Sequence, residues 1–420
     1  MFLRVLPGLL PGALLAGVLA ACLAHAEEPA AAPVATPVER GRYLAAAGNC
    51  ISCHTRSGGA AYAGGVPFDT PMGVIHSTNI TPDAATGIGK WSVQDFRRAM
   101  HEGVAPDGRH LFPAFPYTSF TKVSDADIDD LYAFLKSLKP ERQPAFDNGA
   151  MFAMRWPMAM WNWLQFKPGR YAARADQTAE WNRGAYLVEG LLHCGACHTP
   201  RNWMLAERAD QPLQGGVLEG DVGNGASRAW SAVDLRSGHG GLSGWSVEDL
   251  ARYLQRGVSS KAGTFGPMNE VIVNSTRLLT PTDLRAVAVY IKSLKHEAMR
   301  AAPPAAVGGG AAAAEAAAGA ALYKDRCGKC HGPSGRGSVF SGPPVAGSAV
   351  VQADDPASLI NVILFGPQLA PEVSYGQWET MKAYGDVLDD AQVATLANYL
   401  RSTWGNRGAP ITPAAVAKQR

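Results

Sequence analysis

The sequence has little charge and lacks the patterns that build most catalytic sites. Only 18% of its 420 residues are charged, and the formal net charge is +2 at pH 7. No Gly-rich turn follows a strand pattern, and neither a Ser/His/Asp arrangement nor a carboxylate pair in an acid–base setting is recognisable. These absences argue against a nucleotide-binding enzyme or a hydrolase, and the near-neutral charge gives no electrostatic basis for binding nucleic acid. Strand patterns are also scarce, which predicts an all-α fold.

Long apolar runs are missing beyond the N-terminus, so no transmembrane helix is predicted in the rest of the chain. Arg4 is the only charged residue of an apolar N-terminal stretch that ends in Ala-His-Ala at positions 24–26. This pattern predicts a signal peptide over residues 1–26 and therefore export. The sequence Leu-Ala-Ala-Cys ending at Cys22 also resembles a lipoprotein box, and the alternative is a lipid on Cys22.

Cysteine is scarce as well, but six of the seven residues fall in one repeated pattern. Cys-x-x-Cys-His occurs three times, with the residues Cys50, Cys53 and His54, then Cys194, Cys197 and His198, then Cys327, Cys330 and His331. On a helical turn, two thiols three residues apart can form thioethers to one porphyrin, and the adjacent His presents its imidazole to the iron. A zinc site would need a second Cys or His pair beside each copy, and a redox dithiol would be expected once, at a βαβ turn. We therefore predict three covalently bound c-type haems, with the three histidines as proximal ligands.

The three motifs are spaced as expected for one small domain per haem. Arg-Gly-x-Tyr-Leu precedes each of the first two motifs, and Trp-Ser-Val-x-Asp follows each of them, so these two units repeat closely. An Ala-, Gly- and Pro-rich stretch before the third motif predicts a flexible linker. The predicted division is a first haem domain at 37–140, an aromatic-rich connector at 141–180, a second haem domain at 181–297, a linker at 298–318 and a third haem domain at 319–407.

Helix signals support this division. Ser92 and Ser246, each with Asp three residues later, are predicted helix N-caps. Ser124 and Thr280 are predicted to begin the amphipathic helices that close the first two domains. An aromatic residue recurs at the same position of all three closing helices, namely Phe134, Tyr290 and Tyr399.

An iron that only transfers electrons is best held between His and Met. The Met is expected in a loop shortly before each closing helix. Met268, in Gly266-Pro267-Met268, is the predicted ligand in the second domain, and Met381 is the predicted ligand in the third.

The first domain departs from this pattern, because Phe115 stands where a Met is expected. The local substitutes are Met100, Met72 and His110. We assign Met100 as the distal ligand, with Met72 as the alternative, although a Met on a helix is more often a packing residue. A five-coordinate haem is the remaining interpretation.

The connector contains a dense aromatic stretch at 151–171, with Lys167 and Arg170 near its end. One interpretation is a strap that packs between domains. The other is a surface element that docks on the membrane interface or on a partner, because Trp beside Lys and Arg favours such interfaces.

Together these motifs resemble the tri-haem cytochrome c subunit of bacterial membrane-bound dehydrogenases, a family that serves alcohol, gluconate, sorbitol and fructose dehydrogenases. Beyond the haem motifs, the resemblance rests on the stretches 77–83 and 86–89, 111–114, 181–190, 197–202 and 404–406. It covers nearly the whole mature chain and departs at Phe115, where many relatives carry the distal Met.

The resemblance implies three tandem class I-like cytochrome c domains. It also implies a catalytic dehydrogenase partner that holds flavin, PQQ or molybdopterin, and delivery of electrons to ubiquinone at the periplasmic face of the inner membrane. The chain itself is then expected to have no catalytic site. The alternative is a free-standing multi-haem enzyme such as a peroxidase, which the missing Met of the first domain supports.

Overall fold

The computed structural model describes residues 35–70, 72–146, 148, 156–221, 227–236, 241–294 and 310–420. The predicted signal peptide and Cys22 lie outside these ranges, as do residues 298–309 of the predicted linker. We refer to residues 36–148 as the first segment, to 156–294 as the second and to 310–420 as the third.

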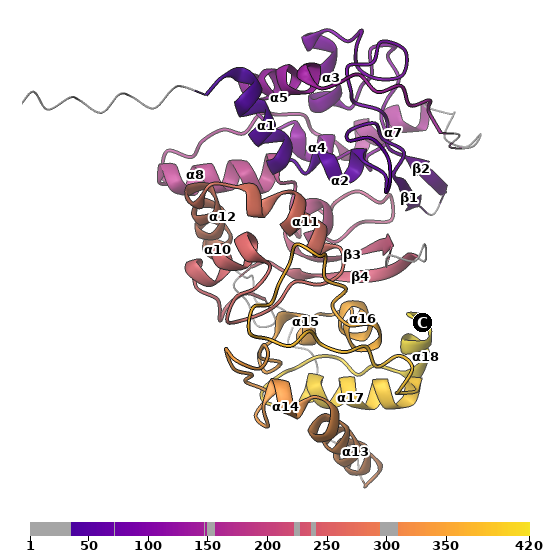
Figure 1. Ribbon diagram of the computed structural model, residues 1–420, viewed down its shortest axis with the longest axis vertical. Helices are drawn as coiled ribbons and strands as arrows, with labels where there is room; N and C mark the ends of the chain where they lie inside the picture. Colours follow the sequence, from indigo (N-terminus) through magenta and orange to yellow (C-terminus); the bar gives the residue numbers. More distant parts are fainter. Residues whose placement is uncertain are drawn as a thin grey trace, which may run out of the picture. The chain divides into compact units, whose positions relative to one another are not determined.

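Most elements are helices (Figure 1). The first segment contains α1 (Pro37–Ala47), α2 (Cys50–His54), β1 (Pro67–Thr70), β2 (Gly73–His76), α3 (Val93–Glu102), α4 (Tyr117–Phe120) and α5 (Asp125–Ser137). The second contains α7 (Trp156–Gln165), α8 (Ala179–Tyr186), the π-helix η1 (Leu187–Leu191), α9 (Gly195–His198), β3 (Gln214–Asp221), β4 (Ser227–Asp234), α10 (Val247–Arg256), α11 (Met268–Asn274), the 3-10 helix η2 (Thr276–Leu278) and α12 (Pro281–Ser293). The third contains α13 (Gly310–Arg326), α14 (Gly328–His331), α15 (Ala349–Gln352), α16 (Ala357–Phe365), α17 (Asp390–Ser402) and α18 (Pro413–Ala417).

The predicted caps are confirmed. The Ser92 and Ser246 hydroxyls accept from the backbone N–H three residues later, and each forms a reciprocal capping box with the Asp at that position. Ser124 and Thr280 cap α5 and α12 in the same way, without the reciprocal bond. Local side-chain chemistry therefore sets where these four helices begin.

One helix crossing occurs in all three segments, where α1 packs on α5, α8 on α12 and α13 on α17 (Figure 1). A glycine lies at each crossing, and a Cβ built on it would stand within 2.8 Å of the Cβ of the recurring aromatic residue. The pairs are Gly41 with Phe134, Gly184 with Tyr290, and Gly319 with Tyr399. The backbones approach too closely for a side chain, so the crossing requires glycine, and the three aromatics occupy equivalent positions.

Matching ion pairs hold the first two crossings. The Arg40 guanidinium donates to both carboxylate oxygens of Asp130 at 2.6 and 2.8 Å, and Arg183 donates to both oxygens of Asp283 at 2.8 Å. Each is a bidentate pair between the N-terminal helix and the closing helix. The repeated Arg-Gly dipeptide thus has the same structural roles in both segments. Gly permits the close approach of the two helices, and Arg forms the ion pair between them.

The fold is not purely helical. β1 and β2 form an antiparallel hairpin, and β3 and β4 form a second one with Gln214 opposite Asp234. The all-α prediction missed both hairpins. The strands of the first are only four residues long, and such short runs carry little periodicity.

The buried side chains form two main clusters. One continuous cluster contains residues of both the first and the second segment, including Leu44, Phe134, Leu191 and Leu284. A separate cluster, centred on α13, α16 and α17, lies within the third segment. The two closely repeated units therefore share one apolar core, whereas the third unit has its own.

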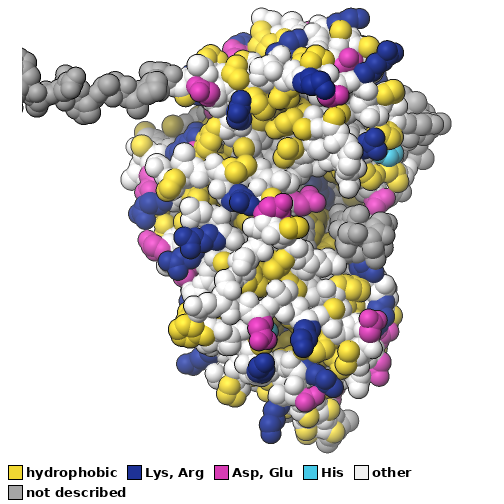
Figure 2. All heavy atoms as spheres, in the orientation of Figure 1, with side chains coloured by type: hydrophobic (Ala, Val, Ile, Leu, Met, Phe, Trp, Pro, Cys, Tyr) yellow, Lys and Arg dark blue, Asp and Glu magenta, His cyan; other side chains and the backbone are white. Residues whose placement is uncertain are grey.

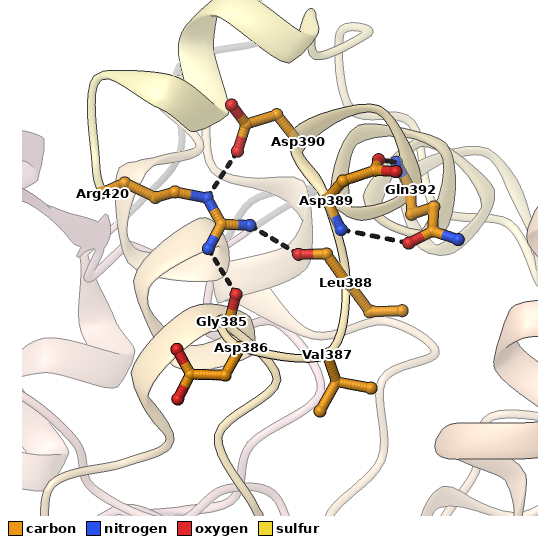
Figure 3. Close-up of a pocket in the computed structure, with 8 residues that line it drawn as sticks. All are labelled: Gly385, Asp386, Val387, Leu388, Asp389, Asp390, Gln392 and Arg420. Carbon is orange, nitrogen blue, oxygen red and sulfur yellow. Dashed lines mark hydrogen bonds and ion pairs between the residues drawn. The ribbon is translucent and has the colours of Figure 1, made fainter.

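The third segment is longer at both ends than the range 319–407 suggests. The described residues 310–318 are helical rather than irregular, because this stretch is rich in alanine, the strongest helix former. At the other end, Val416 of α18 is fully buried in the core of the segment. Figure 3 shows how the C-terminal Arg420 is held: its guanidinium pairs with Asp390 at 2.6 Å and donates to the carbonyls of Gly385 and Leu388.

Charged side chains are sparse on the face in Figure 2, where both signs are scattered among apolar and neutral side chains. Among the helices of the described ranges, none has the length and apolar character that a membrane span requires.

Candidate haem sites

Each Cys-x-x-Cys-His motif forms a helical turn. α2 begins at Cys50, while Cys194 and Cys327 are the N-cap residues of α9 and α14, and each helix ends at the motif histidine. The six motif cysteines are free, with no disulfide among them. Since residues three apart share one face of a helix, each pair of thiols can reach one porphyrin edge. The backbone of all three motifs is therefore compatible with the predicted haem attachment.

The three motif histidines are oriented by the same kind of contact, between Nδ1 and a backbone carbonyl oxygen. Nδ1 of His54 lies 2.6 Å from the Thr78 carbonyl oxygen, and Nδ1 of His198 lies 2.8 Å from that of Val233. Nδ1 of His331 lies 2.8 Å from the Pro343 carbonyl oxygen. A carbonyl only accepts, so Nδ1 carries the proton and Nε2 keeps its lone pair. Such a contact fixes the tautomer and the direction of a metal-binding imidazole.

In the first two sites the acceptor lies in a hairpin strand or just beyond one. Thr78 lies two residues beyond the end of β2, and Val233 belongs to β4. In the third site, Pro343 directly follows the isolated bridge between Ser338 and Gly342. Sequence reasoning found the histidines and missed their carbonyl partners, because a backbone acceptor has no residue-type signature.

Burial sets the ionisation of the motif side chains. It lowers the pKa of His54, His198 and His331 below the ordinary value, and the carbonyl contact opposes this only in part, so burial favours the neutral imidazoles. Burial raises the pKa of the Cys50 thiol to about 12, with a further rise from Cys53. A redox dithiol needs a lowered thiol pKa, so the thiol environment argues against that interpretation of the motif.

The first two sites adjoin each other. Nε2 of His193, the residue before Cys194, lies 3.3 Å from the Gly48 carbonyl, two residues before Cys50. Burial raises the pKa of Cys53 to about 11, and the charges of Glu270 and of Cys197 in the second motif add to the rise. The helix that begins at Met268 also reaches the first site.

Two hydrogen bonds define that last contact. The Asn274 amide of α11 donates to the Ser52 hydroxyl at 2.8 Å, and the Ser275 hydroxyl donates to the Ala47 carbonyl at 2.9 Å. Ser52 lies between the two cysteines of the first motif. The element that carries the predicted ligand of the second haem is therefore fixed to the first haem motif.

The predicted distal ligands have different surroundings. Met268 is the first residue of α11 and Met381 lies in the loop before α17, and both are partly buried against their cores. Met100 on α3 is only 4% exposed within the shared core. Met72, in the turn between β1 and β2, is 44% exposed. These ligand assignments stay predictions.

The aromatic stretch of the connector divides into a buried and an exposed side. On α7, Trp161 is buried and its indole donates to the Met204 carbonyl at 2.8 Å. On the opposite side of α7, Trp163 is 81% exposed. Trp203 is 89% exposed and lies in the loop whose Met204 carbonyl accepts the bond from Trp161. Leu164, Met160 and Leu205 extend the exposed apolar surface. One side of α7 is thus packed against a neighbouring loop, and the other side is exposed.

Comparison with known proteins identifies related chains. The family model described as cytochrome c matches residues 38–139, and the model described as cytochrome c oxidase, cbb3-type, subunit III matches residues 314–400. The gluconate 2-dehydrogenase cytochrome c subunit of Pantoea cypripedii is 38% identical over 397 residues, covering 91% of this chain and 89% of the relative.

Two further relatives differ in how much of their length is shared. The cytochrome c subunit of the quinone alcohol dehydrogenase of Gluconobacter oxydans is 37% identical over 389 residues, which is 90% of this chain and 80% of the relative. A nicotinate dehydrogenase subunit of Pseudomonas putida is 43% identical over 374 residues, which is 87% of this chain but only 30% of that protein. The chain thus spans less than a third of the nicotinate dehydrogenase protein and most of the cytochrome subunits.

Proposed function

Because the chain belongs to the family of cytochrome c subunits of dehydrogenases, we propose that it holds three c-type haems, accepts electrons from a partner dehydrogenase and passes them to membrane ubiquinone. Its relatives support electron transfer from a dehydrogenase. The number of haems, the quinone acceptor and export to the periplasmic side are parts of the proposal. The signal-peptide pattern over residues 1–26 supports export.

The observation that carries this proposal is the threefold repetition of a complete proximal half-site. Each motif pairs two free thiols on one helical turn with an imidazole whose Nδ1 faces a carbonyl. A c-type haem bound there supplies one-electron redox chemistry. The cysteines would hold the haem through thioether bonds, and Nε2 of each histidine, which keeps its lone pair, would be its proximal ligand.

The contacts between the first two sites favour transfer between them. His193 joins the second motif to Gly48, and Asn274 joins α11 to Ser52. The first link joins residues beside the two haem motifs, and the second joins the first motif to the helix that carries the predicted ligand of the second haem. No acid, base or nucleophile of the chain is needed, and the partner dehydrogenase selects the substrate.

The exposed surface of α7 and its neighbouring loop is the proposed contact with the membrane interface. Trp163, Trp203 and Leu164 offer apolar area, and Lys167 beside them is exposed. Indole rings next to a cationic side chain suit the headgroup region. Trp163→Ser is expected to weaken retention on membranes, and Phe340→Ser, at an exposed residue of the third segment, serves as the matched control.

The first test is gentle detergent extraction of the native protein, followed by identification of what co-purifies. We expect a stoichiometric dehydrogenase with flavin, PQQ or molybdopterin, three haems on this chain by mass, and haem reduction by the substrate of that enzyme. Added ubiquinone analogue should reoxidise the haems. Recovery of the chain alone, with turnover of peroxide, would instead indicate a free-standing enzyme.

A further inference from the structure

The helices α3 and α10 begin and end in the same way, and each is followed by a loop. Both helices begin with a Ser capping box and end ten residues later. Each is followed by a glycine in the left-handed conformation, Gly103 with φ 65° and Gly257 with φ 73°. This shared frame allows residues of the first segment to be matched with those of the second.

A hydrogen bond fixes the register of the loops that follow. The Leu111 N–H donates to the Gly103 carbonyl at 2.7 Å, and the Thr264 N–H donates to the Gly257 carbonyl at 2.7 Å. Phe115 lies four residues after Leu111, and Met268 lies four residues after Thr264. The structure therefore places Phe115 at the position that Met268 occupies in the second segment.

The same frame gives Met100 a packing role. Met100 lies eight residues after its N-cap serine, and the residue eight positions after the second N-cap serine is Leu254. Both side chains are buried in the shared core. Leu254 cannot bind iron, so the position is filled for its volume and apolar character, and Met and Leu are close to interchangeable there.

His110 is held in a different role. The Tyr117 hydroxyl donates to the Asn162 amide oxygen, and the amide nitrogen of Asn162 donates to Nδ1 of His110 at 3.0 Å. Nδ1 is therefore an acceptor, and the proton of the neutral ring lies on Nε2. That nitrogen has no lone pair to offer to a metal.

Phe115 itself is held in an aromatic cluster. Its ring lies 5.5 Å from that of Phe120 and 6.4 Å from that of Tyr117, which is fully buried. A phenyl ring has no electron pair for an axial bond. Resting on the proposed function, we infer that the haem of the Cys50–His54 motif has no thioether ligand opposite His54, and that its iron binds small exogenous ligands such as carbon monoxide.

The test uses the full-length protein with its haems attached. Mass determination first counts the covalent haems, and the reduced protein is then titrated with carbon monoxide while the Soret absorption is recorded. We expect one of three haems to bind carbon monoxide. Fewer than three haems would contradict the proposed function, whereas three haems with no carbon monoxide binding would overturn this inference alone.

Variants assign the site. Phe115→Met restores the residue found at the matched position, and it is expected to abolish carbon monoxide binding and to add the charge-transfer absorption of a ferric haem–methionine bond. Met100→Leu, which reproduces Leu254, is expected to change neither signal. The same holds for Met72→Leu, because Met72 is 44% exposed in the turn between β1 and β2, and for Met158→Leu, included because Met158 packs against the cluster that Phe115 contacts. Loss of a methionine–iron signal in any of the three leucine variants would overturn the inference.

Discussion

The three segments meet at two joints that are built differently. At the first joint, between the first and second segments, apolar side chains from both form one core that includes Leu44 and Leu284. At the second joint, between the second and third segments, β4 meets α16 through hydrogen bonds. Ser231 and Ser358 exchange three of these bonds at 2.8 to 3.1 Å, and the Asn361 amide donates to the Ala229 carbonyl at 2.9 Å.

The second joint also leaves some buried polar atoms without a hydrogen-bond partner. Among the described residues, buried side-chain atoms with no hydrogen-bond partner include Nε1 of Trp230, Oδ1 of Asn269 and Oδ1 of Asn361, all at or beside the second joint. Each such atom costs about 1–3 kcal/mol, whereas the apolar burial at the first joint is stabilising. The first two segments should therefore unfold as one unit and the third as another.

The largest expected effect comes from the glycine of the second crossing. A Cβ at position 184 would lie 2.0 Å from the Ala286 carbonyl oxygen, so Gly184→Ala forces two helices of the shared core apart. We expect a loss of about 3 kcal/mol, the upper end for overpacking. Hydrogen exchange read by mass spectrometry should show faster exchange in both the first and the second segment.

The matched control is Gly319→Ala at the crossing of the third segment, where the added Cβ would stand 2.6 Å from the Tyr399 Cβ. Its effect is expected only within residues 310–420. If Gly184→Ala accelerated exchange in the second segment alone, the first two segments would not be a single cooperative unit.

The sequence predicted local features well and the joints poorly. Ser92 and Ser246 were recognisable as caps because capping depends on residues three positions apart. The motif cysteines and histidines carry their chemistry in their own spacing. The shared core could not be foreseen, since an apolar stripe shows that a helix packs and not which helix it meets.

The distal position of the first site shows the same limit. The sequence revealed the missing methionine at Phe115 and predicted Met100 as its replacement. The paired hydrogen bonds of Gly103 and Gly257 fix the loop register that matches Phe115 with Met268, because loop register depends on backbone contacts that the residue pattern does not encode. The shared N-cap serines match Met100 with Leu254.

A smaller effect is expected at the ion pair of the second crossing. Arg183→Ala leaves the mostly buried Asp283 carboxylate without its cationic partner, and because Arg183 is about one-third exposed we expect a loss of about 2 kcal/mol, below the full value for a buried pair. Burial raises the pKa of Asp283, but the bonds from Arg183 and Tyr43 outweigh it and hold the pKa below the ordinary value.

This shift gives the prediction a pH dependence. A carboxyl with a lowered folded-state pKa adds stability above its unfolded pKa of about 3.9, and that stability is lost as the pH falls through the folded value. The difference in urea midpoint between Arg183→Ala and the wild type should therefore be largest at pH 7 and shrink in acid. A difference that is constant down to pH 3 would show that the pair contributes through packing instead of charge.

The smallest expected effect is also the most direct probe of the first joint. The Tyr43 hydroxyl of α1 donates to Asp283 of α12 at 2.6 Å, so it joins the first segment to the ion pair of the second. Tyr43→Phe removes only this hydroxyl, and we expect a loss of about 1.5 kcal/mol, because the acceptor is charged. Tyr323→Phe is the matched control, since its hydroxyl donates to the Gly332 carbonyl at 2.6 Å within the third segment. Hydrogen exchange should rise across the first two segments in Tyr43→Phe and only in the third in Tyr323→Phe. If both variants acted only locally, the shared core alone would couple the first two segments, and the hydrogen bond across the joint would contribute nothing to that coupling.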